Sequence, residues 1–232
     1  MIFLAIDSSS RFFSAAISED KKLISERNVE LERRLSEGLL SVIKDLLKKS
    51  GTSLDKIHGF CVGLGPGSFT GLRIGVSTMK GLAFSLKIPL LGVASLDALA
   101  YNAKGFKRLI CPIIDAKREN LYSCLYEYNK DRLVKKSDYL LIDLKSLLKK
   151  INKPAVFLGD GINLYKKQIS QEIKDALFLP SGFWYPKASI IAKLGLEKLV
   201  RAKNFDSARI RPLYLYPKEC QITKKKKNAK EI

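Results

Sequence analysis

The stretch GLGPGSFTGLRIG, residues 63–75, decides how the rest of the chain is interpreted. It contains five glycines and one proline, and it joins the apolar run 57–64 to a segment with helical periodicity. A strand, a glycine loop and a helix in this order allow two interpretations. Either the loop binds an anion at the start of the helix, or the glycines let another segment of protein approach closely.

Known phosphate-binding sequences do not fit this loop. A Walker A loop requires Gly-x-x-x-x-Gly-Lys-Ser/Thr, which no glycine here begins. A dinucleotide-binding fingerprint, Gly-x-Gly-x-x-Gly, that starts at Gly63 has Ser68 in its last position, and one that starts at Gly65 has Thr70. Free N–H groups at the helix start still leave a weak anion site open.

Glycines within the following helix favour close packing. Gly71, Gly75, Thr78 and Leu82 are spaced so that they share one helix face. A glycine in a helix interior costs about 1 kcal/mol relative to alanine, so we expect a compensating contact. We predict that this face points outward in the monomer and packs against a helix of another subunit. The alternative is that it packs on the protein's own sheet.

Hydrophobic periodicity divides the chain into two similar halves. The first half is predicted to contain strands over 2–9, 12–19, 22–29, 57–64 and 89–94, and helices over 35–50, 71–86 and 95–103. The second half repeats much of this order, with strands over 108–116, 120–128, 134–142 and 155–159, and helices over 143–151 and 163–169. Tandem βββαβα units predict mixed sheets covered by helices.

This order predicts an α/β protein with two lobes. The N-terminal lobe is expected over residues 1–103 and the C-terminal lobe over residues 104–216. A last helix over 187–203 is expected to pack back on the first lobe. The lysine-rich segment 217–232 is expected to be a disordered basic tail.

The chain carries a large positive charge. Its 42 lysines and arginines against 23 acidic residues give a net charge of +19. Such a charge attracts polyanions. The lysines are spread along the chain without a known RNA-reading motif, so solvated helix faces and contact with RNA remain equal alternatives.

Cysteine usage and hydropathy indicate the compartment. Cys61, Cys111, Cys124 and Cys220 stand singly, which indicates reduced thiols. No apolar run has the length of a membrane span, and the start lacks the features of a secretory signal. We therefore expect a cytoplasmic protein without membrane contact.

The stretch 63–75, followed by Lys80-Gly81-Leu82-Ala83 and Ile88-Pro89-Leu90, resembles the TsaB (YeaZ) family. Members of this family take part in bacterial tRNA threonylcarbamoyladenosine biosynthesis. The resemblance covers nearly the whole chain and implies an actin-like (ASKHA, ribonuclease H-like) two-lobed fold. Further matching segments are Leu4-Ala5-Ile6-Asp7, Ser36-Glu37, Ile114-Asp115-Ala116-Lys117-Arg118, Gly159-Asp160-Gly161 and Pro212-Leu213-Tyr214-Leu215.

The resemblance implies a non-catalytic scaffold or activator subunit. The paralogue TsaD transfers the threonylcarbamoyl group to adenosine beside the anticodon, and it binds a metal through a His-Met-Glu-Gly-His segment. The corresponding stretch here, 93–99, contains no histidine, and His58 is the only histidine in the chain. We therefore expect no catalytic residue and no metal. The implied partners are a TsaD-like catalytic subunit and an ATPase subunit of the TsaE type.

Nucleotide binding by the chain alone is not expected. Actin-like ATPases bind phosphates with glycine-containing hairpins that follow an aspartate, whereas here Asp7 precedes Ser8 and Ser9, and Lys117 follows Asp115 closely. The serines leave weak nucleotide contact at Asp7, Ser8 and Ser9 open. ATP or ADP at or near the complex interface is also left open. Two departures from the family pattern, Leu35 in place of histidine and Tyr216 in place of arginine, put the roles of those positions in doubt.

The predicted partner interface is a bundle of two helices from each subunit. Its residues here are Leu39, Val42, Leu46, Gly71, Leu72, Gly75, Thr78, Met79 and Leu82. Two other functions remain as alternatives. A metallopeptidase-like enzyme is opposed by the missing histidine pair, and a free-standing RNA-binding module is favoured by the charge alone. Homodimerisation in the absence of the partner and direct contact with tRNA stay open.

Overall fold

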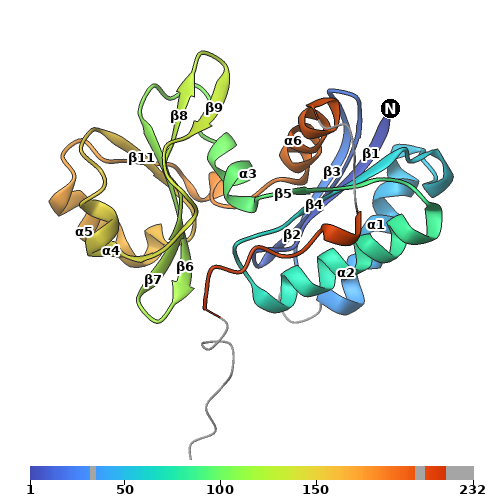
Figure 1. Cartoon of the computed structure of the whole chain (residues 1–232), viewed down its shortest axis with the longest axis horizontal. Coiled ribbons are helices and arrows are strands. Elements are labelled where there is room, and N and C mark those ends of the chain that lie inside the picture. Colours follow the sequence, from blue (N-terminus) through green and yellow to red (C-terminus); the bar gives the residue numbers. More distant parts are fainter. Residues whose placement is uncertain (32–34, 202–206, 218–232) are drawn as a thin grey trace, which may run out of the picture.

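The computed structural model describes residues 1–31, 35–201 and 207–217, which form two lobes side by side (Figure 1). The first lobe contains β1 (Ile2–Asp7), β2 (Phe12–Glu19), β3 (Lys22–Glu30), α1 (Leu35–Ser50), β4 (Gly59–Gly63), α2 (Phe69–Leu86) and β5 (Leu90–Val93). The second contains β6 (Leu109–Lys117), β7 (Asn120–Ser123), β8 (Tyr126–Asn129), β9 (Arg132–Lys135), β10 (Leu140–Asp143), α4 (Leu144–Leu148), β11 (Ala155–Leu158), α5 (Ile162–Glu172) and β12 (Leu177–Phe178). Two further helices, α3 (Ser95–Tyr101) and α6 (Ala188–Arg201), follow the first and the second lobe in the chain.

The two sheets share one topology. The strand order is β3-β2-β1-β4-β5 in the first lobe and β10-β7-β6-β11-β12 in the second. In the first lobe, β1 pairs antiparallel with β2 and parallel with β4. In the second lobe, β6 pairs antiparallel with β7 and parallel with β11. The internal repeat predicted from the sequence is confirmed, because each half places equivalent strands in equivalent positions.

Strand β1 shows how the first lobe becomes a three-layer structure. Successive side chains of a strand point to opposite faces. Leu4 and Ile6 therefore lie in the core beneath α1 and α2, whereas Phe3 and Ala5 lie in the core beneath α6. The sheet is thus covered on both faces, which explains why β1 reads as a continuous apolar run.

Each lobe is completed by a helix from the other half of the chain. Leu96 and Leu99 of α3 lie in the core of the second lobe with Ile110. Ile191 of α6 lies in the core of the first lobe with Phe3. The predicted boundary placed α3 in the first lobe, whereas its two leucines are buried against the sheet of the second, and only Ala98 joins the core beneath α6. The helix α6 packs on the first lobe, and Figure 1 shows it beside β1 and β3.

Two strands predicted as continuous are each divided in two. The segment 120–128 forms β7 and β8, and the segment 134–142 forms β9 and β10. The break in the first lies opposite Pro112 of β6, which has no N–H group to donate to a neighbouring strand. Ser123 Oγ instead donates to the Pro112 carbonyl at 2.8 Å, and Tyr126 resumes the pairing opposite Ile110. The β8–β9 hairpin consequently projects from the sheet.

The cysteines within the described residues are buried. Burial raises the pKa of the Cys61 and Cys111 thiols to about 12, and it also raises the pKa of Cys124. Cys220 and the basic tail from residue 218 onward lie outside the described residues. No helix in the described part of the chain is long and apolar enough to cross a membrane.

Candidate functional site: the interlobe cleft and the outer face of the first two helices

The glycine loop brings α2 directly over the turn that follows β1. A Cβ atom on Gly75 would overlap Ser8 Oγ and come within 3.0 Å of Ser8 Cβ, and one on Gly71 would overlap the Ser8 carbonyl oxygen. Ser8 Oγ donates to the Gly71 carbonyl at 2.9 Å. Backbone N–H of Ser68 donates to the Ser9 carbonyl at 2.7 Å. The prediction that Gly71 and Gly75 face a partner is wrong, because these glycines let α2 pack against its own sheet.

The remaining residues of the predicted interface lie mostly on the inner faces of α1 and α2. Leu39, Leu46, Leu72 and Met79 are buried within the first lobe. Val42, Thr78 and Leu82 are half-buried. Apolar periodicity identifies the stripe of a helix that faces its own core. The four buried residues therefore cannot reach a partner, and only the three half-buried ones expose part of their surface.

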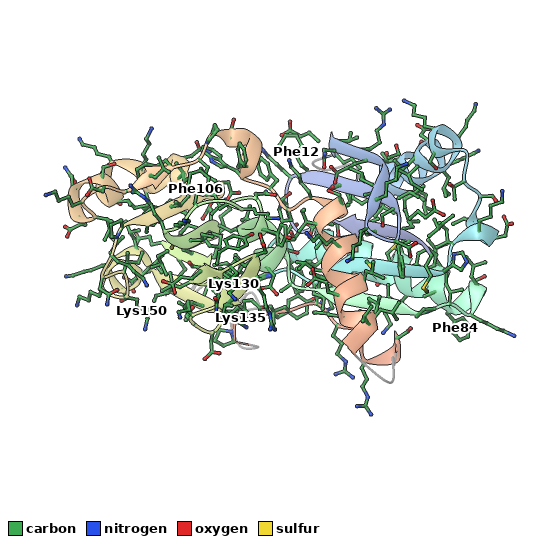
Figure 2. All side chains as sticks on the ribbon, turned by 90° about the horizontal axis from the view of Figure 1, so that it is seen from above. Phe12, Phe84, Phe106, Lys130, Lys135 and Lys150 are labelled. Carbon is green, nitrogen blue, oxygen red and sulfur yellow. The ribbon has the colours of Figure 1, made fainter. Side chains whose placement is uncertain are left out.

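The outer faces of α1 and α2 carry different residues. Phe84 of α2 is 88% exposed and Leu40 of α1 is 55% exposed. Figure 2 shows Phe84 at the end of the first lobe that lies away from the second lobe. Ser77, Gly81 and Ser85 are exposed at intervals of four residues, and a Cβ atom on Gly81 would meet nothing within 4 Å. The sequence signal for this face was a single large aromatic residue outside the apolar period.

Asp7, at the end of β1, is completely buried and surrounded by hydrogen-bond donors. Its Oδ1 accepts from the N–H and the Oγ of Ser9 at 2.9 and 2.6 Å, and its Oδ2 accepts from Ser95 Oγ at 2.6 Å. Ser95 Oγ in turn accepts from the N–H of Gly65 at 2.9 Å. Burial raises the pKa of Asp7, while the hydrogen bonds from Ser9 and Ser95 oppose this shift.

The three nucleotide candidates are therefore engaged by their own chain. Asp7 and Ser8 are 0% exposed, and Ser9 is 4% exposed. Ser9 alone of the three lines the cleft between the lobes. Its hydroxyl group is directed to Asp7 and not into the cleft, so contact with a ligand would require this network to rearrange.

A cavity of about 520 Å³ lies between the lobes. The first lobe contributes the turn after β1 and the start of α2. The second lobe contributes the turn after β6 and Asp160, and the linker before α6 closes one side. The lining includes Ser10, Arg11, Ser68, Phe69, Asp115, Lys117, Arg118, Tyr122, Asp160, Trp184, Tyr185, Tyr214 and Tyr216.

Two carboxylates of the second lobe lie at this cleft. Asp115 forms an ion pair with Lys117 at 2.5 Å, and the hydrogen bond from this pair raises the pKa of Lys117. Asp160 Oδ1 accepts from the N–H of Asp115 at 3.0 Å. Burial, together with the neighbouring charge of Asp115, raises the pKa of Asp160. The cleft thus carries one carboxylate neutralised by a lysine and one that is partly buried.

The C-terminal segment 210–216, which we call the strap, runs from the first lobe to the second (Figure 1). Its residues 213–216 line the cleft. The N–H of Leu213 donates to the Leu64 carbonyl of the first lobe at 2.7 Å. The hydroxyl group of Tyr216 lies within hydrogen-bond distance of the Ala116 and Lys117 carbonyls of the second lobe, at 2.9 and 3.1 Å. Tyr216, whose role the sequence left in doubt, therefore connects the strap to the turn after β6.

Metal-binding side chains do not gather in the described part of the chain, where no group of three His, Cys, Asp or Glu residues could hold an ion. The Nδ1 atom of His58 accepts from the N–H of Ile2 at 3.1 Å, so this histidine fixes the start of β1. The expectation that the chain binds no metal stays a prediction.

Two lobes with one sheet topology around a cleft define an actin-like protein of the ASKHA class. YeaZ from Pseudomonas aeruginosa has the same fold, with a TM-score of 0.78 over 92% of this chain and 99% of that chain at 24% identity. The family model "TsaD: tRNA N6-adenosine threonylcarbamoyltransferase" matches residues 29–222.

Sequence relatives identify the family within this fold class. The tRNA threonylcarbamoyladenosine biosynthesis protein TsaB of Bacillus subtilis is 34% identical over 202 residues, which cover 85% of this chain and 88% of that protein. The TsaB of Buchnera aphidicola subsp. Schizaphis graminum is 30% identical over 197 residues, or 82% and 90% of the two chains. The chain belongs to the TsaB family of tRNA threonylcarbamoyladenosine biosynthesis proteins, as its glycine loop indicated.

Proposed function

We propose that the chain is a non-catalytic scaffold and activator subunit, which binds a TsaD-like catalytic subunit in the cytoplasm during threonylcarbamoyladenosine modification of tRNA. The observation that carries the proposal is the outer face of α1 and α2, defined by Leu40, Ser77, Gly81, Phe84 and Ser85. This face exposes large apolar side chains beside residues with little or no side chain. Such a combination is typical of a surface that packs against another protein.

The energetics of this face favour a helical partner. An exposed phenylalanine gains about 1.5–3 kcal/mol when it is fully buried. A Cβ atom on Gly81 would meet none of the described residues within 4 Å, although a glycine in a helix costs about 1 kcal/mol relative to alanine. A partner helix that crosses α2 at Gly81 would use the absent side chain for close approach and would cover Phe84. Since α1 and α2 lie side by side on one face of the sheet, the interface becomes a bundle of two helices from each subunit.

Several features support the absence of catalysis by this chain. Asp7 is sealed behind Ser9 and Ser95, and the single histidine of the sequence, His58, accepts a backbone hydrogen bond. A metallopeptidase would need a pair of histidine ligands, whereas this sequence contains a single histidine. In the assembled complex, an ATPase subunit of the TsaE type would join, and ATP or ADP would bind at or near the interface. A second copy of this chain would cover the same face when the partner is absent.

The test replaces an apolar residue on the outer face by a charge. Phe84→Glu should weaken binding to the TsaD-like subunit of the same organism at least tenfold and reduce tRNA modification in the reconstituted reaction. Leu164→Glu is the matched control, because Leu164 is 58% exposed on α5 of the other lobe. Calorimetric titration measures both affinities. Binding by Phe84→Glu that equals the wild type would show that this face is not the interface.

A further inference from the structure

The interlobe cleft combines aromatic rings with basic side chains in a way that the scaffold role does not use. The aromatic side chains that line it are Phe69, Tyr122, Trp184, Tyr185, Tyr214 and Tyr216. Arg11, Lys117 and Arg118 line the same cavity. Arg118 is exposed and forms no ion pair within the described residues. Aromatic faces interleaved with cations are the chemistry that binds unpaired nucleotides.

The rings are held in place before any ligand arrives. Phe69 and Tyr214 lie with their ring centroids 5.2 Å apart, and the Arg73 guanidinium lies 3.9 Å from the Phe69 centroid. On the other wall, Tyr122 and Tyr216 meet edge to face at 6.1 Å. Rings fixed by their neighbours lose little conformational freedom when a base stacks on them. Phe69 and Tyr214 nevertheless remain 40% and 38% exposed, so their surface is available.

The turn after β6 is strained where it borders the cleft. Lys117, Arg118 and Glu119 have φ angles of +64°, +50° and +60°, the left-handed region that residues other than glycine rarely adopt. Strain of this kind concentrates at ligand-binding sites, where the surrounding structure holds it in place. Here Tyr216 supplies part of that support through the Ala116 and Lys117 carbonyls. The turn keeps two cations at the mouth of an aromatic cavity.

We propose that this cleft binds an unpaired nucleotide of RNA, with the base among the aromatic rings and its phosphate at Arg118. The proposal rests on the role of the protein in tRNA modification. A cavity of about 520 Å³ falls within the usual size of a small-molecule site and excludes a duplex. Of its two carboxylates, Asp115 is neutralised by Lys117, and Asp160 is positioned to accept from an amino group of a base. The net charge of +19 attracts the rest of the RNA.

The single tryptophan of the chain provides a local probe of this site. Trp184 lines the cleft, and its Nε1–H donates to the Leu179 carbonyl at 2.7 Å, which fixes the indole ring. A short single-stranded RNA oligonucleotide should quench Trp184 fluorescence in the full chain to saturation. At the same salt concentration, the duplex of the same sequence and AMP should bind at least tenfold more weakly. The comparison with the duplex distinguishes an unpaired RNA nucleotide from a general polyanion. The comparison with AMP distinguishes it from a free nucleotide.

Matched charge reversals separate the cleft from the general surface charge. Arg118→Glu should weaken binding of the single-stranded RNA at least tenfold. Lys150→Glu makes the same change in charge on the outer side of the second lobe, away from the cleft (Figure 2), and should weaken binding less than threefold. Both side chains are exposed, so both variants should fold. Phe69→Ala should reduce affinity without any change in charge.

Four results would overturn the proposal. They are an absence of Trp184 quenching, equal losses for the two charge reversals, equal binding of the duplex, or AMP binding as tight as that of the RNA. Arg118→Glu should still bind the TsaD-like subunit, and Phe84→Glu should still bind the RNA. The failure of the cleft and the failure of the outer face of α1 and α2 are therefore distinguishable.

Discussion

The turns after β1 and β6 occupy equivalent positions in the two lobes, yet their carboxylates have opposite environments. Asp7 is completely buried and accepts hydrogen bonds from two serines. Asp115 lies at the cleft and forms an ion pair with Lys117, whose side chain is 82% exposed. One topology thus holds a closed turn in the first lobe and an open turn in the second.

The neighbouring glycines account for this difference. In the first lobe, Gly71 and Gly75 let α2 lie on the turn itself, against Ser8. In the second lobe, Cβ atoms on Gly159 and Gly161 would approach the Ile113 backbone, which lies before the carboxylate in β6. These glycines lie in the loop before α5, so it is this loop that comes close to β6, and the turn after β6 faces the cleft. A duplicated fold can thus keep one site for stability and leave the other for binding.

The largest expected effect comes from opening the closed turn. Gly75→Leu should lower the free energy of unfolding by about 3 kcal/mol, at the upper end of overpacking costs, because its side chain would overlap Ser8. Gly81→Leu is the matched control on the same helix, where nothing lies within 4 Å of the added Cβ. It should fold at least as stably as the wild type and bind the TsaD-like subunit more weakly. Urea unfolding and calorimetric titration measure the two quantities. Wild-type stability in Gly75→Leu would show that α2 does not depend on this contact.

This pair of glycines also shows how far the sequence could predict the structure. The segment 63–75 correctly predicted a strand, a tight loop and a helix with close approach. A glycine in a helix indicates that another segment packs closely against it, but the sequence does not indicate which segment that is. The packing partner of Gly75 is Ser8, 67 positions earlier in the chain, and only the tertiary fold determines that pairing.

The fold was easier to predict from the sequence than the cleft. The duplicated strand order was predictable, since buried strands and amphipathic helices have characteristic hydrophobic periods. The division of 120–128 was not, because the cause is Pro112 in the neighbouring strand. The aromatic lining of the cleft comes from distant segments such as Phe69, Tyr122 and Tyr216, none of which forms a motif by itself.

A smaller effect is expected from the carboxylate of the closed turn. An asparagine at position 7 places an NH2 group where the carboxyl group has its second oxygen, so one serine hydroxyl loses its acceptor. Asp7→Asn should therefore lower the free energy of unfolding by about 1–3 kcal/mol at low pH. Asp115→Asn is the comparison in the open turn. It should cost less than about 1 kcal/mol, because the lysine partner is 82% exposed and the asparagine oxygen can still accept from the N–H of Lys117.

The stability cost of Asp7→Asn should depend on pH. Burial raises the pKa of folded Asp7 above its ordinary value of 3.8, so the folded protein holds this proton more tightly than the unfolded chain. The wild-type free energy of unfolding must then fall as the pH rises from 3.8 through the raised pKa. The asparagine variant does not titrate and lacks this fall. The difference between the two proteins, measured by urea unfolding, should be largest below pH 3.8 and shrink as the pH rises through the raised pKa of Asp7. A constant difference would show that Asp7 does not titrate as the structure implies.

The smallest effect concerns the link between the open turn and the strap. Tyr216→Phe keeps the ring and removes the hydroxyl group that reaches the Ala116 and Lys117 carbonyls. The free energy of unfolding should fall by about 1 kcal/mol, the usual net value of one hydrogen bond. Amide hydrogen exchange should become faster in the turn after β6, because the strained residues Lys117 and Arg118 lose their support. Tyr214→Phe is the control, since the Tyr214 hydroxyl accepts from Arg73 of the first lobe. This variant should leave hydrogen exchange in the turn after β6 unchanged. If both variants exchange alike, the strap does not hold the open turn, and the left-handed backbone of that turn is stable by itself.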